Sequence, residues 1–202
     1  MEKREDNFIR LSGFAVAECT FSHKIENGKV YEVMLAVKRK KGDSFDYIPV
    51  RFCEKIAVPD DIDKGQFYYV EGTVRDRKCE KGKPEVYVWA DSVQLEEDDS
   101  YVNAVELKGI VDREIVKRMT PKSNIEIADI KLKISSENTR TYILPCVAWY
   151  ANARFAANNY SVGDTLKIIG HICSRTYRKR IDVDKVYEKD IREISVISVK
   201  KL

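Results

Sequence analysis

The sequence predicts an all-β fold with short helices, in which two five-stranded Greek-key barrels follow one another along the chain. The first observation is an internal repeat, in which turn-forming, amide and apolar residues recur 96 residues later. The pairs are Asn7 and Asn103, Leu11 and Leu107, Gly13 and Gly109, and Pro49 and Pro145. After a two-residue insertion the offset becomes 98, as in Gly65 and Gly163, Gly72 and Gly170, and Arg77 and Arg175. A period near 96 residues is the size of a small domain, so the chain contains a duplicated unit.

The second observation is the composition of the 202-residue chain. Hydrophobic residues make up 44% and aromatic residues 10%, which is enough for two modest cores and excludes wholesale disorder. No apolar run approaches the ~20 residues that cross a bilayer, and the first residues lack the apolar segment of a secretory signal. The odd number of scattered cysteines indicates reduced thiols in a cytoplasm, without a disulfide frame or zinc site. They are Cys19, Cys53, Cys79, Cys146 and Cys173.

The third observation is a charge division between the two halves. Residues 1–99 hold 17 Lys and Arg against 21 Asp and Glu, and residues 100–202 hold 19 against 12. The balances of −4 and +7 make up the net charge of +3, so a polyanion is expected to meet mainly the second half. Residues 96–100 are charged or polar throughout and cannot be buried, which predicts domains 1–97 and 101–202.

The elements of the first half follow from turn signals between apolar segments. Residues 8–21 predict a long first strand, and Gly13 inside it indicates a bend or bulge. The dipeptide Asn27-Gly28 is a strong hairpin signal. Further strands are therefore expected over residues 30–37, 45–53, 67–77 and 84–95, with a short helix or irregular crossover over 55–63.

The second half repeats this order, with strands expected over residues 102–117, 125–134, 141–149, 165–176 and 181–186. Residues 150–159 are rich in alanine and contain no glycine or proline, so they predict a helix. Residues 191–199 are expected to add a further strand. Three strands, a short helix and two strands are the element order of the OB-fold, a Greek-key barrel that binds oligonucleotides.

Several segments resemble the bacterial single-stranded-DNA-binding (SSB) protein family. Residues 103–113, Asn-Ala-Val-Glu-Leu-Lys-Gly-Ile-Val-Asp-Arg, are similar to the first strand of the family. Residues 71–79 and 86–91 are similar to its fourth and fifth strands. Trp149 and Ala153 resemble the aromatic residue after the third strand and the alanine of the helix. The resemblance implies single-stranded DNA as the ligand, four barrels per assembly and hence a homodimer of this two-barrel chain.

The sequence also departs from the family pattern at three places. Position 79, often a stacking tryptophan in the family, is cysteine, whereas its equivalent in the second half is Tyr177. Cys53 stands at the position equivalent to Trp149. The chain ends in Ser-Val-Lys-Lys-Leu, without the acidic tail that recruits replication and repair enzymes in the family and that primosomal relatives also lack. We therefore expect the first half to bind weakly or to serve in assembly.

Binding single strands requires cations along the phosphates and flat side chains on which bases stack. In the second half the expected DNA-binding residues are Trp149, Arg113, Lys117, Arg118, and the hairpin tip formed by Arg175, Tyr177, Arg178, Lys179 and Arg180. Trp149 and Tyr150 are adjacent, so one ring should face the core, and the resemblance favours Trp149 as the exposed one. In the first half the candidates are Lys38, Arg39, Lys40, Phe52, Arg75, Arg77 and Trp89, with a core position also open for Trp89.

No motif for catalysis, metal or cofactor binding is present. His23 and His171 have no companions at metal-ligand spacing, and there is no phosphate-binding loop. Residues 60–63 hold three carboxylates without the remaining ligands of a calcium loop. The sequence therefore predicts a non-catalytic protein, without metal or cofactor.

The function predicted is sequence-independent single-stranded DNA binding in replication, recombination and repair, in the cytoplasm and at the nucleoid, away from membranes. Replication or primosome proteins are the expected further partners. The alternative is an OB-fold adaptor between proteins of a replication, primosome, plasmid or phage assembly. RNA binding and a small nuclease are the remaining hypotheses.

Overall fold

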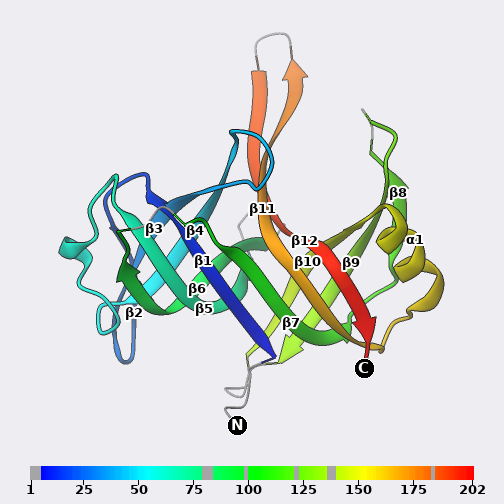
Figure 1. Ribbon diagram of the computed structural model, residues 1–202, viewed down its shortest axis with the longest axis horizontal. Helices are drawn as coiled ribbons and strands as arrows, with labels where there is room; N and C mark the ends of the chain where they lie inside the picture. Colours follow the sequence, from blue (N-terminus) through cyan, green and yellow to red (C-terminus); the bar gives the residue numbers. More distant parts are fainter. Residues whose placement is uncertain (1–5, 79–83, 98–99, 121–122, 136–139, 183–184) are drawn as a thin grey trace.

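The computed structural model describes residues 6–78, 84–97, 100–120, 123–135, 140–182 and 185–202 (Figure 1). Within these ranges, residues 78, 84, 177–182 and 185–189 are described by their backbone alone. The described chain is all-β, with one α-helix and one short 3₁₀ helix. None of its helices is both long and apolar enough to cross a membrane.

The first half forms six strands and a 3₁₀ helix, η1. They are β1 (Asn7–Ala15), β2 (Thr20–Ile25), β3 (Gly28–Lys38), β4 (Phe45–Cys53), η1 (Pro59–Asp61), β5 (Phe67–Lys78) and β6 (Pro84–Leu95). The predicted first strand is thus two strands, because β1 ends where it curls onto β3. Gly13 lies at this bend, and a Cβ there would collide with the carbonyl oxygen of Ala36.

The second half repeats this arrangement and adds a true helix. It contains β7 (Asn103–Val111), β8 (Val116–Met119), β9 (Glu126–Ser135), β10 (Thr141–Trp149), α1 (Tyr150–Asn159), β11 (Thr165–Asp182) and β12 (Lys185–Lys201). The helix is confirmed over the predicted residues. The predicted strand over 181–186 does not exist as a separate element, because residues 181–182 end β11 and residues 185–186 begin β12, which continues through the predicted strand over 191–199. This prediction was wrong.

The sheet follows the same order in both halves, which confirms two tandem OB-fold barrels. The first runs β2-β3-β4-β6-β5-β1 and the second runs β8-β9-β10-β12-β11-β7, with closing pairs β1–β3 and β7–β9. In each barrel one pair is parallel, β4–β6 and β10–β12. An antiparallel ladder between β1 and β7 joins the barrels into one 12-stranded sheet.

The repeated asparagines hold equivalent positions at this junction. The side-chain amide of Asn7 donates to the carbonyl of Val74 at 2.7 Å, and its oxygen accepts the Val74 N–H at 2.9 Å. Asn103 makes the same two bonds to Ile172, at 2.8 and 2.9 Å. Each asparagine thus extends its strand's ladder, which explains why the amide side chain recurs.

The interior of each barrel is filled by the inward side chains of its strands. Ile48, Val50 and Phe52 alternate along β4 and are fully buried. The expectation that Phe52 contacts DNA was wrong, because its ring fills the first core. Leu107 and Leu144 occupy the second core.

Candidate nucleic-acid interface

The outer face of the first barrel carries arginines and aromatic rings side by side. The outward residues of β4, β6 and β5 are Tyr47, Arg51, Tyr87, Trp89 and Arg75, which we call the outer face. Their cross-strand register pairs Arg51 with Trp89 and Arg75 with Tyr87. The candidate Trp89 therefore lies on this face and outside the core.

Two of these rings are covered on one side by a guanidinium group. The central carbon of Arg75 lies 4.5 Å from the centre of the Trp89 ring, and that of Arg51 lies 4.7 Å from the Tyr87 ring. Arg75 also lies 5.6 Å from the ring of Tyr142, in the second barrel. Cation–π contacts of this kind orient both partners. Tyr87 and Arg51 are buried, whereas Trp89 and Arg75 are partly exposed, so Trp89 is the ring of these two on which a base can stack.

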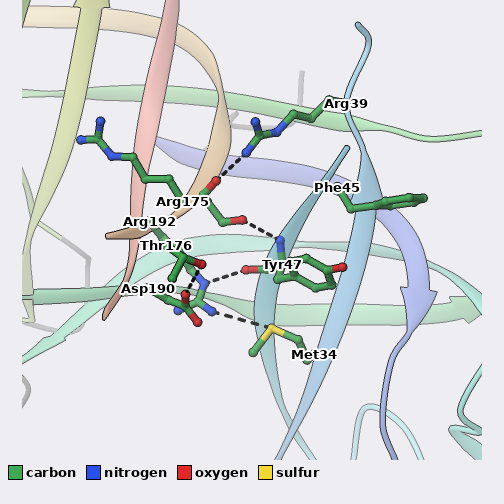
Figure 2. Close-up of a pocket in the computed structure, with 9 residues that line it drawn as sticks. Met34, Arg39, Phe45, Tyr47, Arg175, Thr176, Asp190 and Arg192 are labelled. Atoms are coloured by element: carbon green, nitrogen blue, oxygen red, sulfur yellow. Dashed lines mark hydrogen bonds between the residues drawn. The ribbon is translucent and has the colours of Figure 1, made fainter. Parts of the chain in front are cut away.

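A cleft of about 770 Å³, the inter-barrel cleft, lies between the two barrels (Figure 2). One side comes from β3, β4 and their connection, and the other comes from β11 and β12. The lining residues are Met34, Arg39, Phe45, Tyr47, Ser174, Arg175, Thr176, Asp190 and Arg192.

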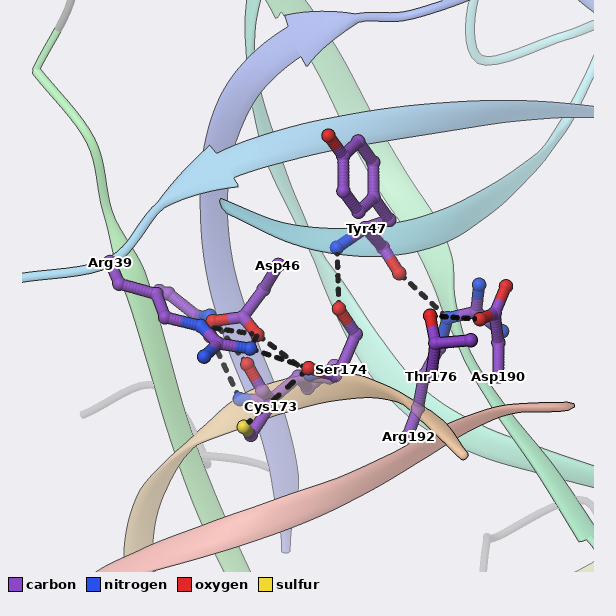
Figure 3. Close-up of polar contacts among 10 residues, drawn as sticks. Arg39, Asp46, Tyr47, Cys173, Ser174, Thr176, Asp190 and Arg192 are labelled. Atoms are coloured by element: carbon purple, nitrogen blue, oxygen red, sulfur yellow. Dashed lines mark hydrogen bonds and ion pairs between the residues drawn. The ribbon is translucent and has the colours of Figure 1, made fainter. Parts of the chain in front are cut away.

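Hydrogen bonds across the cleft floor fix the barrels together (Figure 3). Arg39 donates to Asp46 Oδ1 at 2.8 and 3.0 Å and to the carbonyl of Ser174 at 2.5 Å. The Ser174 N–H donates to Asp46 Oδ1 at 2.7 Å, and the Tyr47 N–H donates to Ser174 Oγ at 2.8 Å. Arg192 donates to the carbonyl of Tyr47 at 2.7 Å. The candidate Arg39 is therefore a structural link between the barrels, in addition to any contact with a phosphate.

Most of the described candidate cations are paired with a carboxylate. The pairs and their N···O distances are Arg77–Glu85, 2.5 Å; Arg118–Asp129, 2.5 Å; Arg175–Glu193, 3.0 Å; Arg113–Asp112, 3.2 Å; Lys117–Glu126, 3.3 Å; and Lys38–Asp43, 3.4 Å. Burial raises the pKa of Glu193, the partner of Arg175, above its usual value.

The candidate Lys40 lies exposed on the connection between β3 and β4. Pairing lowers the positive potential that a strand would meet along the second barrel.

The outer face of the second barrel differs from that of the first. At the register positions of Tyr87 and Trp89 it has Glu193 and Ser195, as the pairs Cys146↔Ile194 and Val50↔Val88 show. Among the described residues, the aromatic rings at these register positions thus belong to the first barrel.

Trp149 is half-buried at the start of α1, and its indole Nε1 is buried without a hydrogen-bond partner. Tyr150 next to it has a positive φ of 53° and is 60% exposed. Of the two adjacent rings the exposed one is Tyr150, so the placement expected for Trp149 was wrong. The helix begins at Tyr150, so strand alternation does not continue across this junction.

The segment 175–180 lies along a two-stranded arm that projects from the barrels (Figure 1). Its backbone pairs with β12, for example Tyr177 with Lys189 and Arg178 with Glu188. The pairing continues beyond this segment to Asp182 and Lys185, so the basic segment lies along the paired strands of the arm and not at the tip that the sequence predicted. The side chains of Tyr177, Arg178, Lys179 and Arg180 lie outside the described part of the chain.

Tyr47, Arg51, Tyr87 and Tyr142 are not among the residues predicted from the sequence. Strand alternation provides a signal for Tyr47, since it has opposite parity to Ile48, Val50 and Phe52. Over the described ranges no group of three or more His, Cys, Asp or Glu side chains is placed to hold a metal ion. Burial raises the pKa of the Cys173 thiol beside the cleft to about 11, so it is unreactive at neutral pH.

No model of a known protein family matches the sequence, and no curated protein does. Among solved structures, the wild-type single-stranded DNA binding protein from Thermus aquaticus aligns at a TM-score of 0.74 and 23% identity, covering 99% of this chain and 94% of that one. A deletion mutant of the same protein aligns at 0.74 and 24%, covering 97% and 94%. The N-terminal domain of PriB from Thermoanaerobacter tencongensis aligns at 0.41 and 22% over 46% of this chain. The chain has the tandem OB fold of the Thermus aquaticus single-stranded DNA binding protein.

Proposed function

We propose that this protein binds single-stranded DNA without strong sequence preference and without catalysis, in replication, recombination and repair. The observation that carries the proposal is the outer face, where the partly exposed ring of Trp89 lies beside the guanidinium group of Arg75 on an OB-fold. Rings stack on any base, so such a face favours binding without sequence choice. The shared fold of the Thermus aquaticus protein supports the same ligand class.

In this mechanism bases stack on the partly exposed Trp89, and phosphates meet arginine guanidinium groups. Each stacked base contributes about 1–3 kcal/mol, and phosphate contacts add a salt-dependent share. The arm, with Arg178, Lys179 and Arg180 in its sequence, brings further cations to the strand. Domains 1–97 and 101–202 then share one strand, with stacking mainly on the first and charge mainly on the second.

The proposed assembly is a homodimer with four barrels, working in the cytoplasm and at the nucleoid. Replication or primosome proteins are the proposed further partners. Light scattering at micromolar concentration, with and without an oligonucleotide, tests the dimer: the mass of two 23.4 kDa chains supports it and that of a single chain contradicts it.

The DNA proposal is tested by fluorescence anisotropy of a labelled oligo-dT at low and at moderate salt. The proposal predicts saturable binding that weakens as salt rises. Competition with unlabelled oligo-rU decides between DNA and RNA. Gel analysis of the oligonucleotide with added Mg²⁺ tests the nuclease hypothesis. Absence of binding at low salt contradicts the proposal.

The adaptor function is the second candidate, and the paired cations favour it. Exposed apolar side chains also gather at the far end of the second barrel, on β8 and α1: Val116, Met119, Tyr150 and Phe155. Pairing with carboxylates weakens the attraction for a polyanion, and exposed apolar groups are typical of protein-binding surfaces. If oligo-dT does not bind, a pull-down with the purified chain as bait becomes the test of this candidate.

A further inference from the structure

The inter-barrel cleft is formed jointly by the two barrels and is lined by aromatic and cationic side chains. Phe45 and Tyr47 lie on β4 on one side, and Arg175, Thr176 and Asp190 lie on the arm on the other (Figure 2). Its volume of about 770 Å³ is within the usual range of ligand sites. None of the bonds described above uses the ring of Tyr47.

We propose that the inter-barrel cleft binds one nucleotide of a DNA strand at the point where the strand passes from the first barrel to the second. Tyr47 is the platform for the base, and Arg175 contacts the adjoining phosphate. The proposal rests on the proposed function and adds a site that belongs to neither barrel alone.

Tyr47 is placed for stacking by its backbone. Its N–H donates to Ser174 Oγ at 2.8 Å and its carbonyl accepts from Arg192 Nε at 2.7 Å, so both backbone groups are fixed to the second barrel. The residue is nevertheless 48% exposed. An exposed ring on a fixed backbone loses little conformational entropy when a base stacks on it.

The cations of the cleft are oriented by carboxylates that lie beneath them. The side chain of Arg39 is 36% exposed whereas that of Asp46 is 3% exposed. For Arg175 and Glu193 the exposed fractions are 43% and 10%. Each guanidinium group is therefore bound by a carboxylate on its buried side. Its remaining N–H groups face solvent, where they can donate hydrogen bonds to a phosphate.

The lining also contains one exposed carboxylate, that of Asp190. Its negative charge repels a phosphate. Its Oδ1 accepts a hydrogen bond from Thr176 Oγ1 at 2.8 Å. Asparagine can accept the same bond through its side-chain oxygen without the negative charge. Asp190→Asn is therefore expected to strengthen oligonucleotide binding, an effect that a purely structural role of the cleft would not produce.

The experiment measures the Kd of labelled oligo-dT for wild type and matched pairs of variants at low salt. Tyr47→Ala is expected to weaken binding about 5- to 150-fold, the equivalent of one stacked base, while Tyr47→Phe stays near wild type. Phe155→Ala, an equally exposed ring on α1, is the control and should bind as wild type does. Asp190→Asn should bind about two- to tenfold more tightly, and the control Asp60→Asn, on η1, should not.

Thermal unfolding of each variant verifies that it is folded, and if Tyr47→Ala unfolds, the Asp190→Asn and Asp60→Asn pair decides. If wild type binds oligo-dT and the cleft variants bind as their controls do, the cleft assignment is overturned and the proposed function stands. If wild type does not bind at all, both are overturned.

Discussion

The backbone N–H of Ile143 donates a hydrogen bond to Oδ1 of Asp76 at 3.1 Å and ties β10 of the second barrel to β5 of the first. Its counterpart is the bond from the Tyr47 N–H to Ser174 Oγ at 2.8 Å. Positions 47 and 143 are 96 apart and positions 76 and 174 are 98 apart, the two offsets of the sequence repeat. The junction between the barrels is therefore pseudo-symmetric, and each barrel fixes a strand of the other.

The Asp76 bond predicts a pH-dependent stability. Burial raises the pKa of Asp76, so its ionised form is less favourable in the folded than in the unfolded chain. The protonated Asp76 side chain stabilises the fold fully when the pH lies below the pKa that Asp76 has in the unfolded chain. This stabilisation is lost as the pH rises through the higher pKa that Asp76 has in the folded chain. Asp76→Asn keeps the acceptor for Ile143 and does not titrate, so it should gain stability relative to wild type as the pH rises from about 4 to 7.

Urea unfolding of wild type, Asp76→Asn and Asp76→Ala across this pH range checks the prediction. Asp76→Ala removes the acceptor and should be about 1–3 kcal/mol less stable than Asp76→Asn at every pH. A difference between wild type and Asp76→Asn that is constant with pH, or that shrinks as the pH rises, contradicts the assignment.

The hydrogen bonds of Asn103 predict that removing its side chain lowers the stability of the protein. Asn103→Ala removes two hydrogen bonds to Ile172 and leaves both backbone groups without their partner. We expect a loss of about 1–3 kcal/mol in the free energy of unfolding, measured with urea. Asn158→Ala, at an exposed position of α1, should change it by less than about 0.5 kcal/mol. Equal effects of the two substitutions would show that the Asn103 bonds do not stabilise the second barrel.

The arm predicts two kinds of binding defect. Tyr177→Ala should weaken oligo-dT binding by a similar factor at all salt concentrations, because it removes a stacking contact. Arg178→Ala should instead reduce the slope of log K against log salt concentration by about 0.7, the share of one phosphate contact on a single strand. Arg118→Ala should change the slope less, since Asp129 already neutralises that cation. Unchanged binding in both arm variants would remove the arm from the interface.

The sequence predicted the duplication, the strand order and the helix because each depends on local patterns. The buried position of Phe52 was also readable from the sequence, since strand alternation puts it with Ile48 and Val50. The continuous β12 was not readable. Its outer part lies in the arm, where the charged residues Glu188, Lys189 and Asp190 interrupt the apolar alternation.

The candidate site was predicted only in part. Trp89 and Arg75 were selected from sequence and lie together on the outer face. The bonds of Arg39 to Asp46 and Ser174 join residues up to 135 positions apart, and no local pattern encodes such a contact. The same applies to Tyr142, which reaches Arg75 only across the junction.

The most direct test of the account is a titration of the protein with oligo-dT while following tryptophan fluorescence, in wild type and in Trp89→Phe. Wild type contains two tryptophans, Trp89 on the outer face and the half-buried Trp149. We predict strong, salt-sensitive quenching in wild type and little quenching in Trp89→Phe, which still binds because the phenyl ring that replaces the indole can stack on a base. Quenching that persists in Trp89→Phe, or its absence in wild type at low salt, would contradict stacking on the outer face.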